Sequence, residues 1–492
     1  MLLLGIDIGT SSIKVAIVDA TTSKTLVTVQ YPETESPIKS LNFGWAEQDP
    51  TMWWEHVQAA ILKAHATKKY DPSNIVSIGI AYQMHGLVIV DKNQQVLRDS
   101  IIWCDSRAVA IGNKAFENIG EEKALSHLLN SPGNFTASKL AWVKENEPSI
   151  FEKIDKVMLP GDFIAMKLSG SITTSIAALS EGIFWDFKNK EISKEVLNYF
   201  GFSTAIFPSI QEVFSVHGLV KSDIATKLNL PVGIPIAYKA GDQPNNALSL
   251  NVLSPGEVAA TAGTSGVIYG VGDTLNFDKA SRINQFAHVN YSLEQDRLGM
   301  LLCINGTGIM NSWTKKYIGE QIDYAAMNEA AEKISIGSDG LQILPFGNGA
   351  ERIFNNAIVG AQILNLDLNK HTNAHIYRAV QEGIAFAFRY GIDIMRDNGI
   401  QPAVIKAGNA NMFKSKVFTE AFVNTLNVPI ELYDVDGSVG AAKGGGIGAK
   451  IYASSKDAFA NDQPIQTIEP TVYETYNEQY EHWLKQLQQF IQ

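Results

Sequence analysis

Two short turns that could hold phosphate groups stand in different halves of the chain. Gly9-Thr10-Ser11 follows an apolar stretch that contains Asp7, and Gly263-Thr264-Ser265 lies between two apolar stretches near the middle of the chain. Backbone N–H groups at such a turn can cradle phosphate oxygens, and threonine and serine hydroxyls add donors. Each turn alone is equally well explained as a simple hairpin. The pair favours a triphosphate held from two sides.

Two aspartates stand beside apolar strands where they could take part in phosphoryl transfer. Asp242 follows the apolar run IPIAYKAG and begins a predicted helix, with Gln243 beside it. A carboxylate there can cap the helix, or it can accept the proton of an attacking hydroxyl. Asp7 ends the first apolar run, where a carboxylate can reach a Mg²⁺ ion that is bound to phosphates. The chain contains no GxxxxGK[ST] motif, which disfavours a P-loop kinase.

A polar loop in the first quarter of the chain has side chains suited to hydroxyl groups. QMHG, from Gln83 to Gly86, separates two predicted strands, and IIWCDSR, from Ile101 to Arg107, follows. The position of His85 near Gln83, Trp103, Asp105 and Arg107 is compatible with a polyol-binding loop and with an ordinary core histidine. The nine histidines include no metal-ligand spacing such as HExxH.

The elements that would position these groups alternate between strands and helices, which indicates an α/β fold. LLLGIDIGTSSIKVAIVDA and GEVAATAGTSGVIYGV both read as strand, turn, strand. Their repetition half a chain apart predicts two similar domains, which we divide into residues 1–245 and 246–492. Asp49 and Pro50 predict a helix start. The run of small residues from Gly440 to Gly448 predicts close approach by a flat ligand or another helix.

Composition limits the classes of partner and compartment. The 492 residues include 40 Lys and Arg against 51 Asp and Glu, a net charge of −11. A negative surface repels phosphate backbones, so we expect no nucleic-acid partner. The two cysteines cannot make a disulfide framework and are expected as small buried residues. No apolar run is long enough for a membrane span, and MLLLGIDIGT lacks the basic start of a signal peptide. We therefore expect a cytoplasmic protein.

Taken together, these segments resemble the FGGY carbohydrate kinases. The resemblance rests on GIDIGTSSIKV, WAEQDPTMWW, QMHG, IIWCDSR, SKLAWVKENEP, LPGDFIAMKLSG, GDQPNNA and TAGTSGV. It extends from residue 5 to the glycine-rich helix near residue 448, which is nearly the whole chain. Within the family, QMHG and KVMLPGDFIAMKLSG are most similar to the xylulokinases.

The resemblance implies two ribonuclease H-like domains of the actin-like ATPase type, which close on ATP, Mg²⁺ and a sugar. Asp242 would be the catalytic base for the terminal hydroxyl of D-xylulose, and Asp7 would help to hold the metal. The sugar would contact Met84, His85, Asp242, Gln243 and Trp103. The phosphates would lie against Thr10, Ser11, Gly263 and Thr264, and the adenosine against Gly408, Asn409 and Met412. A homodimer is the assembly we expect.

Two segments depart from the family pattern. The adenosine loop reads Ala407-Gly408-Asn409-Ala410 where three glycines are usual, and PFGNGAER, from Pro345 to Arg352, is one residue longer than the usual PYLxGER. Both departures bear on nucleotide preference more than on the reaction. Alternatives within the family are kinases for gluconate, ribulose or glycerol. The alternative from another class is an actin-like ATPase that acts as a nucleotide switch without phosphorylating a sugar.

Overall fold

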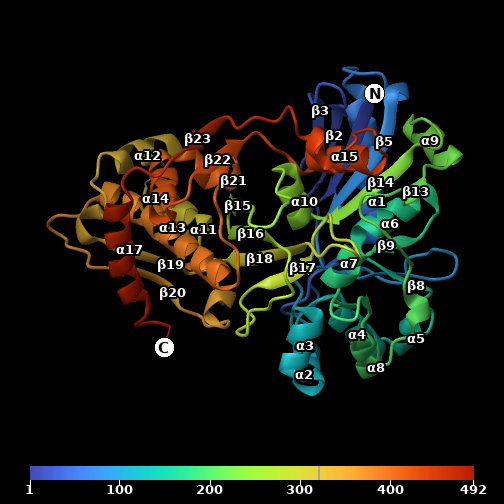
Figure 1. Cartoon of the computed structure of the whole chain (residues 1–492), viewed down its shortest axis with the longest axis horizontal. Helices are drawn as coiled ribbons and strands as arrows, with labels where there is room; N and C mark the ends of the chain where they lie inside the picture. The colour runs from blue at the N-terminus through green and yellow to red at the C-terminus, as the bar shows by residue number, and fades with distance from the viewer. Residues whose placement is uncertain (320–321, 492) are drawn as a thin grey trace.

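The computed structural model describes residues 1–319 and 322–491, which form two large sheets flanked by helices (Figure 1). The first sheet has six strands in the order β13-β14-β5-β1-β2-β3. They are β1 (Leu2–Ile8), β2 (Ile13–Asp19), β3 (Thr25–Tyr31), β5 (Ile75–Tyr82), β13 (Gly218–Leu219) and β14 (Pro235–Gly241). The second sheet has seven strands in the order β17-β18-β16-β15-β21-β22-β23. They are β15 (Val258–Ala262), β16 (Gly266–Gly272), β17 (Asn284–Ala287), β18 (Leu298–Ile304), β21 (Ile405–Gly408), β22 (Ile430–Tyr433) and β23 (Gln466–Ile468).

The two sheets repeat one topology. In the first, β1, β2 and β3 form an antiparallel meander, β5 pairs with β1 in parallel, and β14 pairs with β5 in parallel. In the second, β15, β16 and β18 form the meander, β21 pairs with β15 in parallel, and β22 pairs with β21 in parallel. Each Gly-Thr-Ser turn joins the first two strands of its meander. The sheet topology therefore confirms the internal repeat that the paired turns predicted.

The helices of the first half include a group that extends away from its sheet. The helices of this half are α1 (Pro50–Ala66), α2 (Val109–Ile119), α3 (Glu121–Leu128), α4 (Thr136–Asn146), α5 (Pro148–Phe151), α6 (Pro160–Ser169), α7 (Ile176–Glu181), α8 (Lys194–Phe200), α9 (Ser222–Leu228) and α10 (Asp242–Ser249). Figure 1 shows α2, α3, α4, α5 and α8 grouped beneath the first sheet. Asp49 accepts the N–H of Thr51 as the N-cap of α1, with Pro50 next to it, as predicted.

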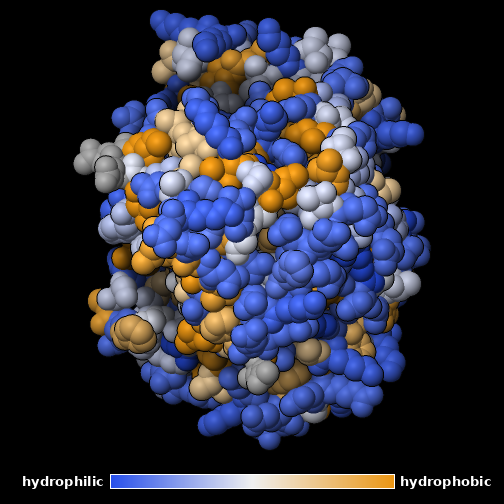
Figure 2. All heavy atoms as spheres, turned by 90° about the vertical axis from the view of Figure 1, so that its left-hand side faces the viewer, coloured by the Kyte–Doolittle hydropathy of each residue, from blue (hydrophilic) through white to orange (hydrophobic). Residues whose placement is uncertain are grey.

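The second half contributes the remaining long helices. They are α11 (Gly308–Tyr317), α12 (Tyr324–Glu332), α13 (Asn373–Asp397), α14 (Lys416–Leu426), α15 (Gly437–Gly448), α16 (Ser455–Ala458) and α17 (Tyr473–Leu487). Figure 2 views the end of the molecule that lies at the left of Figure 1, near α17 and α12. Polar side chains cover most of this face, with apolar ones interspersed, as is normal for a protein surface.

Short elements connect these layers. Two-stranded pairs are formed by β4 (Glu47–Gln48) with β7 (Ser100–Ile101), β6 (Val88–Val90) with β8 (Lys156–Met158), β9 (Thr173–Ser175) with β12 (Ser209–Gln211), β10 (Trp185–Asp186) with β11 (Glu191–Ile192) and β19 (Gln342–Phe346) with β20 (Gly360–Leu364). Single 3₁₀ turns are η1 (Pro72–Asn74), η2 (Thr204–Ile206), η3 (Ser338–Gly340), η4 (Arg352–Phe354) and η5 (Asn411–Lys414). Among the described residues, no helix is long and apolar enough to cross a membrane.

Helix α15 belongs to the second half of the chain but packs on the first sheet, which Figure 1 shows beside β2 and β5. The small residues are required there. A Cβ on Gly5 would lie 1.8 Å from the Ser438 carbonyl oxygen, and one on Gly79 would lie 1.8 Å from that of Ala441. The close packing predicted for Gly440 to Gly448 is therefore contact with strands. The expectation of two buried cysteines was wrong, because Cys104 is exposed and Cys303 is half-buried.

Candidate active site

The predicted site residues lie at the carboxyl ends of parallel strands. Asp7 is near the end of β1, Met84 follows β5 and Asp242 follows β14, and these strands are neighbours in the first sheet. In the second sheet, Gly263 follows β15 and Gly408 ends β21. Ligands of open α/β sheets bind outside these strand ends. The repeated topology thus places one set of predicted residues on each sheet at the corresponding edge.

Neighbouring carboxylates raise the pKa of both Asp242 and Asp7. Burial, together with the charge of Asp7, raises the pKa of Asp242 to about 7. Burial and the charge of Asp436 raise the pKa of Asp7 to about 6. Gly241, rather than Asp242, occupies the N-cap position of α10. A carboxylate with a pKa near neutrality is suited to accept a proton, and a divalent cation would offset the repulsion between two such groups.

Asp436 is a third carboxylate near this pair, and the sequence analysis missed it. It is the N-cap of α15, accepts hydrogen bonds from Ser438, and forms an ion pair of 3.2 Å with Lys14. Burial opposes its ionisation, but the bonds from Ser438 and the charge of Lys14 outweigh burial and lower its pKa. A Cβ on Gly437 would lie 2.5 Å from Asp7 Oδ2. The start of α15 therefore borders Asp7, and the signal for it was an Asp-Gly pair before a run of small residues.

The first Gly-Thr-Ser turn is tied to the predicted sugar loop. The Thr10 hydroxyl donates to Gln83 Oε1 at 3.1 Å and accepts from the Trp103 indole N–H at 3.0 Å. The Ser11 carbonyl accepts the N–H of Ser36 at 2.7 Å, and the Ser11 side chain is exposed. The structure thus brings Thr10 and Trp103 together, although they are 93 positions apart.

His85 lies in a left-handed turn, with a φ of 65°. Its N–H donates to Glu181 Oε1 at 2.7 Å, and its Nδ1 lies 3.2 Å from the Glu181 carbonyl oxygen. Burial and the charges of Lys139 and Arg352 lower its pKa to about 3, so the imidazole is neutral. If Nδ1–H donates to that carbonyl, Nε2 is left as an acceptor. The His85 side chain keeps 15% of its surface exposed, which suits ligand contact better than a fully enclosed core position.

Glu181 is a second residue that the sequence analysis missed. Its side chain is only 3% exposed, and it also accepts from the Tyr82 hydroxyl at 3.4 Å. Burial raises its pKa well above the usual range. Met84 packs beside it, since a Cβ on Gly241 would come within 2.6 Å of Met84 Cγ and 3.0 Å of Glu181 Oε2. Glu181 therefore borders both the His85 loop and the residue before Asp242. The six-residue helix α7 carries no periodic signal that could have singled it out.

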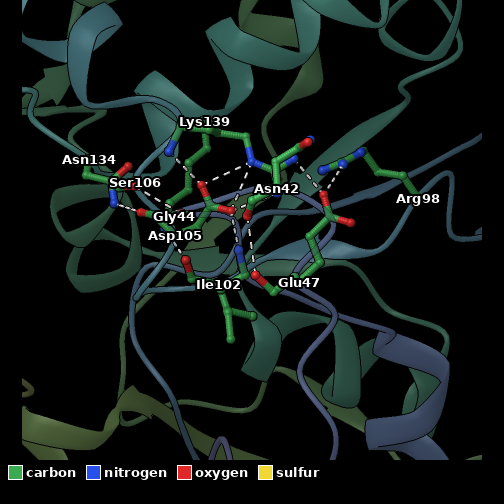
Figure 3. A network of polar contacts seen from close by, with 12 residues as sticks. Asn42, Gly44, Glu47, Arg98, Ile102, Asp105, Ser106, Asn134 and Lys139 are labelled. Atoms are coloured by element: carbon green, nitrogen blue, oxygen red, sulfur yellow. Dashed lines mark hydrogen bonds and ion pairs between the residues drawn. The ribbon is translucent and has the colours of Figure 1, made fainter.

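Asp105 and Arg107, which the sequence placed near His85, form a buried ion network instead of a hydroxyl-binding surface. Figure 3 shows Asp105 of this network together with Glu47 and Arg98. Asp105 is fully buried and accepts the N–H of Ala46 at 2.6 Å. Arg107 also pairs with Glu47 at 2.6 Å, and Arg98 reaches the same Glu47 oxygen at 2.5 Å. The network joins the segment around residue 46 to the loop that carries Trp103.

Lys139 connects the loop that carries Trp103 to the His85 turn by hydrogen bonds. Its Nζ donates to the carbonyl oxygens of His85, at 2.8 Å, and Ile102, at 3.0 Å. Figure 3 shows Lys139 reaching toward Ile102 beside Asp105. Burial lowers its pKa to about 7, although Asp105 acts in the opposite direction. The sequence analysis quoted the helix that contains Lys139 but gave the residue no role.

The second Gly-Thr-Ser turn borders a cavity of about 400 Å³. The carbonyl oxygens of Gly263 and Thr264 accept the N–H groups of Gly308, at 3.1 Å, and Ile309, at 3.0 Å, at the start of α11. Met412 lines the same cavity. The full lining is Ala262, Gly263, Thr264, Gly308, Asn311, Ser312, Tyr324, Asn328, Asn411, Met412, Lys414 and Ser415. Tyr324 and Asn328 were not anticipated from the sequence.

A smaller cavity of about 160 Å³ lies next to it, and the two share Ala262 and Asn411. Gly408 lines this cavity, and so do Asn246 of α10 and Gly437 of α15. Helix α10, which begins at Asp242, therefore borders the same cavity as Gly408 of the predicted adenosine loop. Asn409 is exposed and donates its N–H to the Tyr433 carbonyl at 2.8 Å. Gln243 stabilises the ionised Asp242 through backbone and side-chain hydrogen bonds.

Comparison with known proteins agrees with this arrangement. Residues 2–249 match the family model of the N-terminal domain of the FGGY family of carbohydrate kinases, and residues 258–448 match that of its C-terminal domain. The chain belongs to the FGGY family of carbohydrate kinases. It is therefore a carbohydrate kinase, as the sequence motifs indicated.

Individual relatives extend the comparison. A xylulose kinase of Haemophilus influenzae is 28% identical over 457 residues, which cover 91% of this chain and 90% of that protein. The crystal structure of xylulose kinase from Rhodospirillum rubrum superposes with a TM-score of 0.89 at 24% identity and covers both chains completely. A gluconate kinase from Lactobacillus acidophilus has the same fold, with a TM-score of 0.88 at 21% identity over 100% of this chain and 98% of that one. The predicted fold, two ribonuclease H-like domains of the actin-like type, is confirmed.

Proposed function

We propose that this kinase transfers the γ-phosphoryl group of ATP to D-xylulose and releases ADP and D-xylulose 5-phosphate. The observation that carries the proposal is the half-buried Asp242 carboxylate, which follows Gly241 beside Met84 of the His85 loop and has a pKa of about 7, as suits a proton acceptor. The choice of sugar is supported by relatives named xylulose kinase that align along nearly the whole chain.

In the proposed reaction, Asp242 accepts the proton of the terminal sugar hydroxyl. The oxygen forms a bond to the γ-phosphorus while the bond between that phosphorus and the β-γ bridging oxygen of ATP breaks. Positioning and neutralisation of charge supply most of the catalysis in phosphoryl transfer, so the base has only to orient the hydroxyl and take its proton. Asp242 is the first residue of α10, directly after the end of β14.

The nucleotide would lie across both sheets. Thr10, Ser11, Gly263 and Thr264 would bind the phosphates, and the cavities beside the second turn would take the adenosine. Gly408 and Met412 line these cavities, and the adenosine would also meet Asn409, which follows Gly408 in the chain. The residues also fit Mg²⁺, because Asp7 offers a carboxylate whose ionisation is opposed by burial and by Asp436. When bound, the ion would neutralise phosphate charge, and Asp7 would hold it together with water and phosphate oxygens.

The sugar would occupy the space on the His85 side. Its hydroxyl groups would meet His85 Nε2, the amide of Gln243 and the exposed indole of Trp103, with Met84 as an apolar contact. We place the boundary between the two domains near residues 246–255, which assigns residues 1–245 to the sugar-binding domain. Residues 246–492 form the other domain, whose helix α15 packs against the first sheet.

An ADP-release assay with a panel of ketoses, polyols and aldonic acids tests the choice of substrate. We expect D-xylulose to give the highest kcat/KM. A preference for gluconate, ribulose or glycerol would move the chain to another substrate within its family. ATP turnover that no sugar stimulates would favour an actin-like nucleotide switch.

Asp242→Asn tests the base. General-base removal lowers kcat by roughly 10²- to 10⁴-fold, and ATP binding should persist. Asp223→Asn is a matched control, because Asp223 also lies in the first turn of a helix but is exposed on α9. A kcat of Asp242→Asn within about threefold of the wild type would contradict the role of Asp242 as base.

A further inference from the structure

Arg352 is a half-buried cation. Burial lowers the pKa of its guanidinium, and no carboxylate within residues 1–319 and 322–491 forms an ion pair with it. Its one hydrogen bond there is from Nη1 to Asn284 Oδ1. A guanidinium carries five N–H donors, and a buried charge is normally paired because its desolvation is costly. Arg352 therefore has guanidinium donors that no described residue occupies.

The loop of Arg352 is held against the end of β18. Glu351 accepts the backbone N–H groups of Asn305, at 2.9 Å, and Gly306, at 2.7 Å. Cys303 lies two residues before this anchor, on β18, and its thiol responds to the charges of both Arg352 and Asp242. Arg352 thus comes from the second domain but lies in the neighbourhood of the proposed base.

The same guanidinium faces the His85 loop of the first domain. Asn284 and Phe286 are two residues apart in β17, so their side chains project from the same face, about 7 Å apart. The Phe286 ring centroid lies 5.4 Å from that of His85, and Asn284 holds Arg352. The positive charge of Arg352 contributes to the lowered pKa of His85. His85, Asn284, Cys303 and Arg352 are each only half-buried, so a ligand can reach them.

The other polar groups of the His85 loop leave a donor missing. His85 is neutral, and with Nδ1–H directed to the Glu181 carbonyl its Nε2 can only accept. The Lys139 ammonium already donates hydrogen bonds to two backbone carbonyls. Asp242 is an acceptor when ionised. Apart from the Gln243 amide, the free donors that this loop's surroundings offer to a ligand oxygen that can only accept are those of Arg352.

We propose that Arg352 binds the C2 carbonyl oxygen of the ketose and thereby selects ketoses over the corresponding polyols. This inference rests on the proposed function. A ketose has two unlike ends: the hydroxyl that is phosphorylated must donate to Asp242, and the carbonyl can only accept. The site offers the complementary groups: the acceptor Asp242 from the first domain and the donor Arg352 from the second. Arg352 thus orients the sugar and gives it a contact with both domains.

Arg352→Met, which has a side chain of similar length without donors, tests this binding role. The dissociation constants of D-xylulose and of xylitol, in which the carbonyl is reduced to a hydroxyl, are measured by calorimetry without nucleotide, together with KM and kcat. We expect weaker D-xylulose binding by roughly 10- to 100-fold, with a change of less than about threefold for xylitol. Arg282→Met is the control, since Arg282 is paired with Asp278, and it should leave both sugars unaffected.

Two further variants keep the test decisive if Arg352→Met folds poorly, as judged by its melting temperature. Arg352→Lys keeps the charge with fewer donors and should weaken D-xylulose binding less. Asn284→Asp would supply a carboxylate to Arg352, occupy its donors and weaken D-xylulose binding while Arg352 remains in place.

Three outcomes would overturn the inference. Equal weakening of D-xylulose and xylitol binding would show that the contact is not to the carbonyl. A lower kcat with unchanged sugar affinity would assign Arg352 to the phosphoryl group, and unchanged kinetics with a lower melting temperature would make it structural. A wild-type enzyme that phosphorylates no ketose would contradict the proposed function itself, whereas an active wild type with an unaffected Arg352→Met variant contradicts only this inference.

Discussion

Glu181 is expected to control sugar affinity without touching the reacting atoms, because it holds the turn that carries His85. Its Oε1 accepts the His85 N–H at 2.7 Å in a position only 3% exposed. His85 adopts a φ of 65°, a left-handed conformation that costs a non-glycine residue about 1–2 kcal/mol. The hydrogen bond to Glu181 helps to offset this cost, together with the bond from Lys139 to the His85 carbonyl. Two substitutions, Glu181→Ala and Glu181→Gln, separate the contribution of the acceptor from that of the charge.

The expected size of the effect follows from the burial of the bond. Glu181→Ala leaves the buried His85 N–H without a partner, which costs about 1–3 kcal/mol. If the turn relaxes to avoid that cost, the sugar loses its contact with His85, and sugar KM rises roughly 10- to 100-fold. Burial raises the pKa of Glu181 well above its usual range and so favours the neutral acid. Glu181→Gln keeps a neutral acceptor, and its sugar KM should stay within about threefold of the wild type.

The assay is steady-state ADP release, with KM measured separately for D-xylulose and ATP, and with a melting temperature for each variant. Glu191→Gln serves as control, since Glu191 is a partly exposed partner of Lys194. ATP KM should not change in any variant. The reasoning is refuted if Glu181→Ala leaves sugar KM unchanged. Equal losses from Ala and Gln would show that the charge of Glu181, rather than its acceptor oxygen, supports the site.

The remaining predictions concern a sugar contact, a motion and a pH dependence. His85→Ala should raise sugar KM about fivefold, the loss of one hydrogen bond, and leave ATP KM unchanged; a lower melting temperature with unchanged sugar KM would make His85 a core residue. Sugar should close the cleft partly, and sugar with a non-hydrolysable ATP analogue further; an identical radius of gyration by small-angle scattering in the apo, sugar-bound and doubly bound states would contradict this. His288 is buried, hydrogen-bonded to Tyr269 and Val252, and its pKa is lowered from 6.5 to about 3. Between pH 6.5 and about 3, the His288 imidazole is protonated in the unfolded chain but not in the folded chain. The free energy of unfolding therefore decreases by about 1.4 kcal/mol for each unit by which the pH is lowered in this range. His288→Gln should reduce that slope in urea unfolding from about pH 7 to about pH 5, and an unchanged slope would exclude His288 as its source.

Local features of the fold could be predicted because their signals lie within a few residues of one another. The strand, turn, strand pattern around Gly9-Thr10-Ser11 corresponds to β1 and β2, and its repeat corresponds to β15 and β16. Asp49 and Pro50 begin α1, as predicted. A cap, a turn glycine and an alternation of apolar residues act on neighbouring backbone groups. Their outcome therefore depends little on the rest of the chain.

Contacts between segments far apart in the chain were harder to predict from the sequence. The glycine-rich run predicted close packing, but it did not reveal that α15 lies on the sheet of the other half. The proximity of Asp105 and Arg107 to the QMHG loop in sequence suggested hydroxyl binding, whereas the structure buries them in an ion network with Glu47. A charged side chain looks the same in a sequence whether it meets a ligand or a buried partner.

The sequence by itself determined the family, the order of the elements and the residues Asp7, Asp242 and His85 as candidates, since these depend on motifs and on local backbone preferences. Only the tertiary structure decided which groups surround them. Glu181 meets His85 across 96 positions, and Lys14 meets Asp436 across 422. Such pairs form because burial of the sheets and helices brings distant backbones together, and no propensity of neighbouring residues encodes them. The same holds for Arg352, because only the structure shows that no carboxylate of the described residues pairs with its guanidinium.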